Sequence, residues 1–414
     1  MAAGTSGTST QQQDVERVPY VIVGGGMVAD AAARGIRSRD ADGRILVLGD
    51  DADPPYTRPA LSKKLWTDPD FTEADNDAGT ASATGAEVRT SVRVTAIDTA
   101  ARTVTTGTGD VVGYETLLLA TGGRPKPGPI EDGPRVISFR TAQDYRHLRR
   151  LAGEQRHVVV AGGSYIGTEI AAALVQNDTR TTLVTPDEVL GASMFPPELA
   201  RHFQGMYERA GVVLRTGAKV SGGSGREDGV DVELDDGSTL GADAVVFGFG
   251  IAPLTELAEA AGLTVDDGVV VDEHLRTSDP HVYAAGDVAQ YPDRVLGTTR
   301  VEHVDNAKTM GQAVGELMAG RDEPHDHTPF FYSQVLGTRY EAVGTLDGSA
   351  RTVQDWQTDD GVGGPGVVYY LDDDGRVTGV LLWDVPGKTD EATQVLADTS
   401  PQDEGSLRGR ITGD

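Results

Sequence analysis

Pro19-Tyr20-Val21-Ile22-Val23-Gly24-Gly25-Gly26-Met27-Val28-Ala29 is an apolar run that passes directly into a glycine-rich turn. The run predicts a buried parallel strand, and the Ala-rich stretch Asp30 to Arg39 predicts a helix behind it. Gly24 allows a tight turn, Gly26 lets backbone N–H groups approach a pyrophosphate, and Ala29 lets the helix pack on the strand. The positive end of the helix dipole would face the phosphates.

The same unit continues into a second strand, Arg44 to Leu48, which ends at two acids. Asp50 lies 24 residues beyond Gly26, near the place where a carboxylate binds ribose hydroxyls. The alternative is a glycine-rich turn without a ligand, but strand, helix, strand and acid in this order favour dinucleotide binding. The expected contacts are Gly24, Gly25, Gly26, Met27, Val28, Ala29, Asp50 and Asp51.

A second unit of the same kind begins with the strand His157 to Ala161, which leads into Gly162-Gly163-Ser164-Tyr165-Ile166-Gly167. A helix from Thr168 to Gln176 and a strand from Thr181 to Val184 follow. Serine at the middle-glycine place is small enough to keep the backbone approach open. Two such units imply two bound dinucleotides. The expected contacts in this unit include Gly163, Ser164, Ile166 and Asp187.

The acid after the second unit indicates which nicotinamide cofactor is bound. Asp187 follows Ser164 by 23 residues, nearly the spacing of the first unit. Asp187 and Glu188 favour a free ribose 2′-hydroxyl, whereas a 2′-phosphate would want an arginine just beyond the strand. No arginine stands between residues 186 and 197. We therefore expect NADH, with NADPH less suited.

Composition excludes several classes of function. The 414 residues allow two or three domains, and the absence of cysteine excludes disulfides, thiolate zinc sites and redox-cysteine pairs. The net charge of −28 disfavours nucleic acid and anionic lipid; solubility and adaptation to high salt both account for such an acidic surface. No stretch approaches the roughly 18 apolar residues of a membrane helix. We expect a disordered tail at 1–17, no membrane span, no metal site and a cytoplasmic location.

Three further strand ends carry glycine-containing turns: Ala120-Thr121-Gly122, Phe247-Gly248-Phe249-Gly250 and Tyr283-Ala284-Ala285-Gly286-Asp287. The carboxylate of Asp287 is suited to accept hydrogen bonds from a ribityl hydroxyl. The order of these turns around two Rossmann units resembles the glutathione-reductase-type flavoproteins of the pyridine nucleotide-disulfide oxidoreductase superfamily. The resemblance covers about Pro19 to Ala392. It implies FAD in the first unit, with Thr121, Gly122 and Asp287 as contacts, and NAD(H) in the second.

The segment Pro55-Tyr56-Thr57-Arg58-Pro59-Ala60-Leu61-Ser62-Lys63 resembles two branches of that superfamily, the apoptosis-inducing-factor flavoproteins and the NADH-dependent ferredoxin reductases. The resemblance implies that Arg58 touches the flavin nucleotide and that Lys63 lies near flavin N5, where hydride arrives. Glu169, at the start of the second unit's helix, is implied to pair with Lys63 and to hold a positive charge beside the flavin. The alternative is a surface lysine and a glutamate that suits the helix dipole.

Segments nearer the C-terminus resemble the apoptosis-inducing-factor branch. In Arg300-Val301-Glu302-His303-Val304-Asp305-Asn306-Ala307 the resemblance places Glu302, His303 and Val304 at the flavin and nicotinamide, while Asn306-Ala307 resembles the ferredoxin reductases. In Phe330-Phe331-Tyr332-Ser333, Tyr332 stands in the place of a stacking tryptophan and offers a π face. The alternative for His303 is a polar residue at the start of a helix that binds no ligand. The alternative for Tyr332 is an aromatic residue of the protein core. Further implied cofactor contacts are Val94, Arg140, Tyr165, Gly250 and Glu341.

The expected fold is α/β, with two Rossmann-type nucleotide-binding domains of the glutathione-reductase type and an α+β C-terminal domain. The NAD domain, 138–268, is inserted into the FAD domain, 18–137 and 269–326, and the C-terminal domain spans 327–397. In that last domain we expect strands at Tyr340–Leu346, Val367–Leu371 and Val377–Trp383, a hairpin turn at Asp372–Gly375 and a helix at Glu391–Ala397. We expect disorder at 398–414 and a polar linker around His325 and His327.

Three functions are compatible with these residues. The first is an FAD-dependent NADH oxidoreductase of the apoptosis-inducing-factor type, which passes hydride to flavin N5 and then electrons to quinone, oxygen or a carrier protein. Its candidate catalytic residues are Lys63, Glu169 and His303. The second is an NADH-dependent ferredoxin reductase, which needs a basic docking patch such as Arg34, Arg37, Arg39 and Arg44. The third is an interaction protein that forms a homodimer when NADH reduces the flavin.

Overall fold

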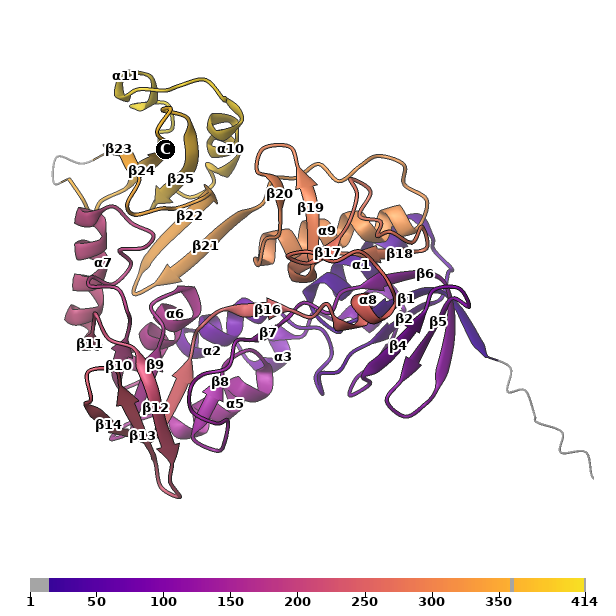
Figure 1. Ribbon diagram of the computed structural model, residues 1–414, viewed down its shortest axis with the longest axis horizontal. Helices are drawn as coiled ribbons and strands as arrows, with labels where there is room; N and C mark the ends of the chain where they lie inside the picture. The colour runs from indigo at the N-terminus through magenta and orange to yellow at the C-terminus, as the bar shows by residue number, and fades with distance from the viewer. Residues whose placement is uncertain (1–14, 358–360, 413–414) are drawn as a thin grey trace, which may run out of the picture.

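The computed structural model describes residues 15–357 and 361–412. It has three parts, which Figure 1 separates: a first domain at the right, a second domain at the lower left and a C-terminal domain at the upper left. Their sheets confirm the expected α/β fold with two Rossmann-type units. Residues 1–14 of the expected N-terminal tail lie outside the described residues, and strand β1 already begins at Glu16.

The first domain is built on a seven-stranded sheet whose central strands are parallel. Strands β1, β2 and β6 end in buried apolar residues, as expected of strands covered on both faces. Helix α1 lies so close to α9 that a side chain at Gly35 or Gly315 would overlap the backbone of the other helix. The strands of the sheet are β1 (Glu16–Val23), β2 (Ile45–Leu48), β3 (Glu87–Arg89), β4 (Val94–Asp98), β5 (Thr103–Thr106), β6 (Val111–Leu119) and β18 (Val282–Ala284). The helices are α1 (Met27–Arg39), α4 (Thr80–Thr84), α8 (Glu256–Ala260) and α9 (Val304–Met318), and a small sheet holds β17 (Val269–Val270), β19 (Ala289–Asp293) and β20 (Gly297–Thr299).

The second domain has a five-stranded parallel sheet in the order β11-β10-β9-β15-β8. Because β8 (Val136–Ser138) pairs with β15, this domain begins two residues before the expected boundary at 138. It also ends before the expected boundary at 268, because Ala258 of α8 and Leu263 are buried in the core of the first domain. Strands β7 (Gly123–Pro125) and β16 (Ile251–Pro253) pair where the chain crosses between the domains (Figure 1). The remaining elements are α5 (Ala142–Leu151), β9 (His157–Ala161), α6 (Tyr165–Val175), β10 (Arg180–Val184), α7 (Pro197–Ala210), β11 (Val213–Arg215), β12 (Val220–Gly225), β13 (Val230–Leu234), β14 (Thr239–Ala242) and β15 (Ala244–Phe247).

A segment of the first domain leaves its own sheet and packs on the second domain. It holds a 3-10 helix (Arg58–Ser62), α2 (Lys64–Thr67) and α3 (Glu73–Asn76). Leu61 of this segment shares a hydrophobic core with Ile170 of α6. Lys63 therefore lies against the second domain, although the strands before it in the sequence, β1 and β2, belong to the sheet of the first domain.

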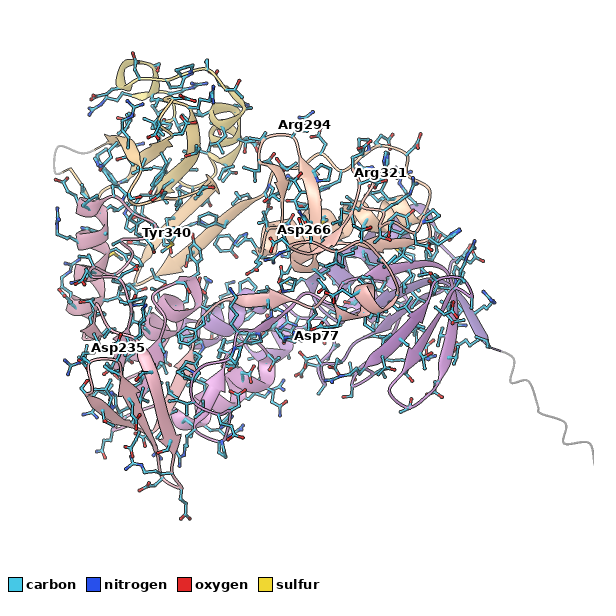
Figure 2. The ribbon with its side chains drawn as sticks, viewed as in Figure 1. Asp77, Asp235, Asp266, Arg294, Arg321 and Tyr340 are labelled. Carbon is cyan, nitrogen blue, oxygen red and sulfur yellow. The ribbon has the colours of Figure 1, made fainter. Side chains whose placement is uncertain are left out.

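The C-terminal domain is an antiparallel sheet in the order β21-β22-β25-β24-β23. On one face, Tyr340 and Trp383 stack with their ring centroids 5.6 Å apart and pack on Phe195 of the second domain. Figure 2 labels Tyr340 at this junction. The other face packs on α10. The elements are β21 (Phe330–Val335), β22 (Thr338–Gly344), β23 (Arg351–Trp356), β24 (Gly366–Leu371), β25 (Val377–Trp383), α10 (Thr389–Ala397) and α11 (Glu404–Leu407).

The structure corrects the sequence analysis in this domain. Strand β22 ends at Gly344 instead of Leu346, α10 starts at Thr389 instead of Glu391, and strands β21 and β23 were missed. The expectation of disorder at 398–414 is wrong for the described residues up to 412, because α11 forms there and Leu407 and Ile411 are buried in the domain core. Two apolar side chains in a polar segment are enough to anchor it.

Candidate cofactor and redox site

The first glycine turn has the shape that a dinucleotide pyrophosphate requires. Gly24 has φ of 122°, and a Cβ there would overlap the carbonyl of Ala120, so the turn itself needs glycine. Gly26 precedes α1, no described side chain caps that helix, and a Cβ on Gly26 would meet no atom within 4 Å. The N-terminal N–H groups of α1, including those of Met27 and Val28, therefore face open space that fits a phosphate. Ala29 is fully buried against the strands, as expected.

The residues expected beside the adenosine half of FAD belong to the same domain as this turn. Asp50 follows β2, its side chain is exposed, and it forms a 2.8 Å ion pair with Arg93. Asp51 accepts a hydrogen bond of 3.0 Å from the hydroxyl of Tyr56. Val94 is buried at the start of β4.

Three chain segments meet where the resemblance implies the flavin half of FAD. Arg140 forms a 2.8 Å ion pair with Asp287, and Arg58 donates to the carbonyl oxygen of Arg140 at 2.9 Å. Burial lowers the pKa of Arg58 below its usual value. Thr121 donates to the carbonyl of Leu254, which holds the crossing between the domains, and the neighbouring Gly122 has φ of 64°. The donors and acceptors in this cluster fit a polar ribityl and phosphate chain.

The second turn repeats the first with one change. Gly162 has φ of 114°, and a Cβ there would come within 2.6 Å of the carbonyl oxygen of Gly248. Ser164 donates its hydroxyl to that same carbonyl at 3.0 Å, and no described side chain caps α6. Serine therefore stabilises the turn and leaves the N-terminus of α6 free for a phosphate.

The other residues expected around the NAD cofactor lie near this turn. Ile166 is exposed, Gly250 has φ of 79° with open space around it, and Asp187 accepts a 3.1 Å hydrogen bond from Ser193. A Cβ on Gly163 would contact the side chain of Thr185, so close packing requires glycine there.

The expected ion pair between Lys63 and Glu169 is present. Its Nζ–Oε1 distance is 2.6 Å, and Glu169 is only 4% exposed. Ser62 and Ser333 also donate to the Glu169 carboxylate, each at 2.6 Å. The pair is therefore a buried charged site, not a surface lysine beside a helix dipole.

His303 caps α9 and joins that helix to the C-terminal domain. The backbone N–H of Asp305 points to Nδ1 at 3.3 Å, and that of Tyr332 points to Nε2 at 3.1 Å. Burial lowers the pKa of His303, so the ring is neutral near pH 7. Because a neutral imidazole has one acceptor nitrogen, it accepts only one of these two bonds in a given tautomer. The neighbouring Glu302 pairs with Arg300 at 2.6 Å.

Tyr332 lies between two cations. Lys63 Nζ is 5.9 Å and the guanidinium carbon of Arg339 is 4.7 Å from the centre of the Tyr332 ring. Glu341 is buried and accepts from the Arg339 guanidinium at 2.6 Å, so it fixes that cation over the ring. Tyr165 packs edge-on against Phe331 at 5.1 Å. Strand β21 thus brings its aromatic residues to Lys63, His303 and Tyr165.

The sequence analysis missed several residues of this site. Ser62 and Ser333 hold Glu169, Arg339 holds Tyr332, and His327 bonds Asp305 at 2.6 Å. His327 is therefore more than a polar linker, because it ties the C-terminal domain to the first turn of α9. The signal available was a serine at the end of one aromatic run, Phe330 to Ser333, where a buried strand favours an apolar residue.

The basic patch suggested for a ferredoxin is only partly neutralised. Arg34 pairs with Asp30 at 3.0 Å, and Arg44 pairs with Glu16 at 2.7 Å. Arg37 donates to a backbone carbonyl at 2.6 Å, which does not cancel its charge. The patch therefore keeps part of its positive charge.

Two helix N-termini with open glycine turns, together with a buried charged pair on the second helix, are typical of an oxidoreductase that binds two dinucleotides. The chain belongs to the pyridine nucleotide-disulphide oxidoreductase family, whose sequence model matches residues 18–311. It is accordingly an FAD-dependent NAD(P)H oxidoreductase. Among the described residues, none of the helices is both long and apolar enough to cross a bilayer.

Similar proteins come from several groups within the family. A monodehydroascorbate reductase of Oryza sativa subsp. japonica is 34% identical over 89% of this chain and 80% of its own length. An apoptosis-inducing factor of Dictyostelium discoideum is 30% identical over 93% of this chain and 79% of its own length. A solved structure of putidaredoxin reductase covalently joined to putidaredoxin superposes with a TM-score of 0.84, at 31% identity, over 94% of this chain and 95% of that one.

Proposed function

We propose that this chain is an NADH-dependent, FAD-containing oxidoreductase of the apoptosis-inducing-factor type, which delivers electrons to an acceptor outside the chain. The observation that carries the proposal is the contact of His303 and Tyr332, the two residues that resemble the apoptosis-inducing-factor branch, beside the buried Lys63–Glu169 pair at the junction of all three parts. When bound, FAD takes a hydride from NADH at N5 and gives up electrons to the acceptor. The absence of cysteine from the chain requires that acceptor to be external.

The protein's own residues hold and align the two cofactors. The turn from Gly24 to Ala29 would hold the FAD pyrophosphate, while Arg58, Arg140 and Asp287 would bind its flavin half. Lys63 keeps a positive charge where the reduced flavin becomes negative. Tyr165 and Tyr332 would border the nicotinamide. Alignment is the main requirement, because hydride transfer between two bound cofactors needs no acid or base side chain.

The preference for NADH is part of the proposal. Asp187 follows β10, where a carboxylate accepts from a ribose 2′-hydroxyl and repels a 2′-phosphate. The formal net charge of −28 further disfavours the more anionic NADPH. A steady-state comparison of kcat/KM for the two nucleotides tests this, and equal or reversed values would reject it.

Reduction of a ferredoxin-type carrier protein is the second candidate, favoured by the close superposition on putidaredoxin reductase. The net charge of −28 argues for a small acceptor instead, because it would repel an acidic ferredoxin.

A screen of acceptors separates these candidates. The NADH-reduced holoprotein is mixed with a quinone, oxygen, the monodehydroascorbate radical or a ferredoxin, and flavin reoxidation is followed by absorbance. The proposal expects a small acceptor to reoxidise the flavin faster than a ferredoxin does. Fast, salt-sensitive reoxidation by ferredoxin alone would establish the second candidate.

Two finer expectations belong to this proposal. NADH is an intracellular reductant, which supports the cytoplasm as the compartment, and cell fractionation tests this. A homodimer that forms on flavin reduction stays a prediction. Size measurement with and without NADH tests it, and an unchanged mass would remove it.

A further inference from the structure

The carboxylate of Glu169 gathers donors from three directions. Lys63 and Ser62 come from the segment of the first domain that packs on α6, and Ser333 comes from β21 of the C-terminal domain. Lys63 Nζ and Ser333 Oγ both lie 2.6 Å from Oε1, whereas Ser62 Oγ lies 2.6 Å from Oε2. Glu169 itself belongs to α6 of the second domain, so all three parts of the molecule meet at one carboxylate.

Burial makes these contacts specific. Ser62 is 5% exposed, Ser333 is fully buried and Glu169 is 4% exposed. A buried hydroxyl or carboxylate without hydrogen-bond partners is costly, so each group requires the other. The two hydroxyls occupy one lone pair on each carboxylate oxygen.

This arrangement has a consequence for Lys63. An ammonium group carries three donors, and a carboxylate without other partners would attract as many of them as geometry allows. Both oxygens of Glu169 are already bonded to serines, and Lys63 contacts Oε1 at 2.6 Å. On its other side the ammonium faces the Tyr332 ring. Its remaining donors are thus free for the flavin side of the pair.

We propose that Ser62 and Ser333 are positioning residues, which hold Glu169 so that the charge of Lys63 is directed at the flavin instead of being absorbed by Glu169. This inference rests on the proposed function, and it adds that the C-terminal domain helps to set the reduction potential of FAD. Removal of either hydroxyl leaves Glu169 short of a donor, and a second N–H of Lys63 turns from the flavin side to the vacated lone pair of the carboxylate. The positive field at the flavin falls, and reduction becomes less favourable.

The test is the flavin midpoint potential of the holoprotein, measured by equilibration with a redox dye. For Ser333→Ala we expect the equilibrium constant for two-electron reduction to fall about tenfold, which is about 30 mV more negative. Ser333→Thr retains the hydroxyl and should restore the wild-type potential. The matched control is Ser349→Ala, an exposed serine of the same domain, which should leave the potential unchanged.

The same substitution in a Lys63→Met protein distinguishes a positioning role of Ser333 from a purely structural one. In a Lys63→Met protein, Ser333→Ala should add no further shift, because the serine acts through the lysine. If Ser333→Ala fails to retain FAD, Ser62→Ala carries the same test from the first domain, with a shift in the same direction. An unchanged potential in a folded, FAD-loaded serine variant would overturn the inference, as would an equal shift in the Lys63→Met background.

The outcome is distinct from failure of the proposed function. If the wild-type flavin is not reduced by NADH at all, the proposed function fails. If NADH reduces the wild-type flavin and the serine variants keep its potential, only the positioning role fails.

Discussion

The two Rossmann units share a strand–turn–helix plan, but their helices contact different surroundings. Helix α1 packs on α9 of its own domain, with Gly35 and Gly315 at backbone contact. Helix α6 is buried along most of its length and carries Glu169 to the junction with the other two parts of the molecule. The first unit's helix therefore packs within its own domain, whereas the second unit's helix also brings a charged group to the junction of the three parts.

The largest expected effect comes from replacing the first glycine of each turn, and it differs between the two turns. Gly24→Ala places a Cβ at φ of 122° against the Ala120 carbonyl, and we expect about 3 kcal/mol of lost stability and loss of FAD. Gly162→Ala should instead lose NADH affinity and retain FAD. Flavin content and NADH titration check both variants. Loss of FAD from the Gly162 variant alone would reverse the assignment of the two units.

The next effect concerns the charged group of the second unit. Glu169→Gln removes the carboxylate that holds the Lys63 ammonium in position, so the ammonium is displaced from the flavin, and we expect flavin reduction by NADH to slow roughly 10- to 100-fold, about 1.4–2.7 kcal/mol of barrier, with FAD retained. Stopped-flow absorbance measures the rate. Exposed Glu404→Gln is a matched control outside the site. A rate equal to wild type would show that α6 has only a structural role.

A smaller effect sharpens the chemistry of the second unit. Asp187→Ser removes the negative charge expected at the ribose, and we expect the ratio of kcat/KM for NADH over NADPH to fall about tenfold, or about 1.4 kcal/mol. The equivalent change at the first unit, Asp50→Ser, should leave this ratio unchanged. If Asp50→Ser changes the ratio and Asp187→Ser does not, NAD binds the first unit.

The smallest effect concerns the contact between the C-terminal domain and α9. The hydrogen bond with Asp305 raises the pKa of His327, so the pair adds stability that is complete below about pH 6.5 and is lost as pH rises through the folded pKa. His327→Gln should cost about 0.5 kcal/mol at pH 6 and nothing at pH 9, a small value because the ring is partly exposed.

Denaturant unfolding of both proteins at the two pH values measures this difference. Burial, with a smaller contribution from the charge of His327, lowers the pKa of His325 to about 4, which removes stability as pH falls below 6.5. Because His327→Gln removes that contribution, the variant loses less of this stability, which offsets part of the expected cost at pH 6. A His327→Gln cost that grows with pH would contradict the assignment.

The features that could be predicted from the sequence are those formed by residues close together in the chain. The two glycine turns, the strands beside them and the acid after each unit lie within short segments, so backbone geometry and hydrogen-bonding rules suffice. The Lys63–Glu169 pair came from the resemblance and is present. The roles of the other site residues stay predictions.

The sequence analysis missed contacts between distant segments. Ser62 is 107 residues and Ser333 is 164 residues from Glu169 along the chain, and no local pattern relates them. His327 and Asp305 likewise meet only because β21 starts beside α9. The apolar anchors Leu407 and Ile411 are too sparse to predict a folded segment.

The central claim is that NADH gives its hydride directly to FAD at the junction of the three parts. Its most direct test is anaerobic stopped-flow mixing of the FAD-loaded protein with NADH and with NADH deuterated at C4. We expect one NADH to bleach one flavin, and deuterium to slow the bleaching. A flavin that stays oxidised with excess NADH would contradict it.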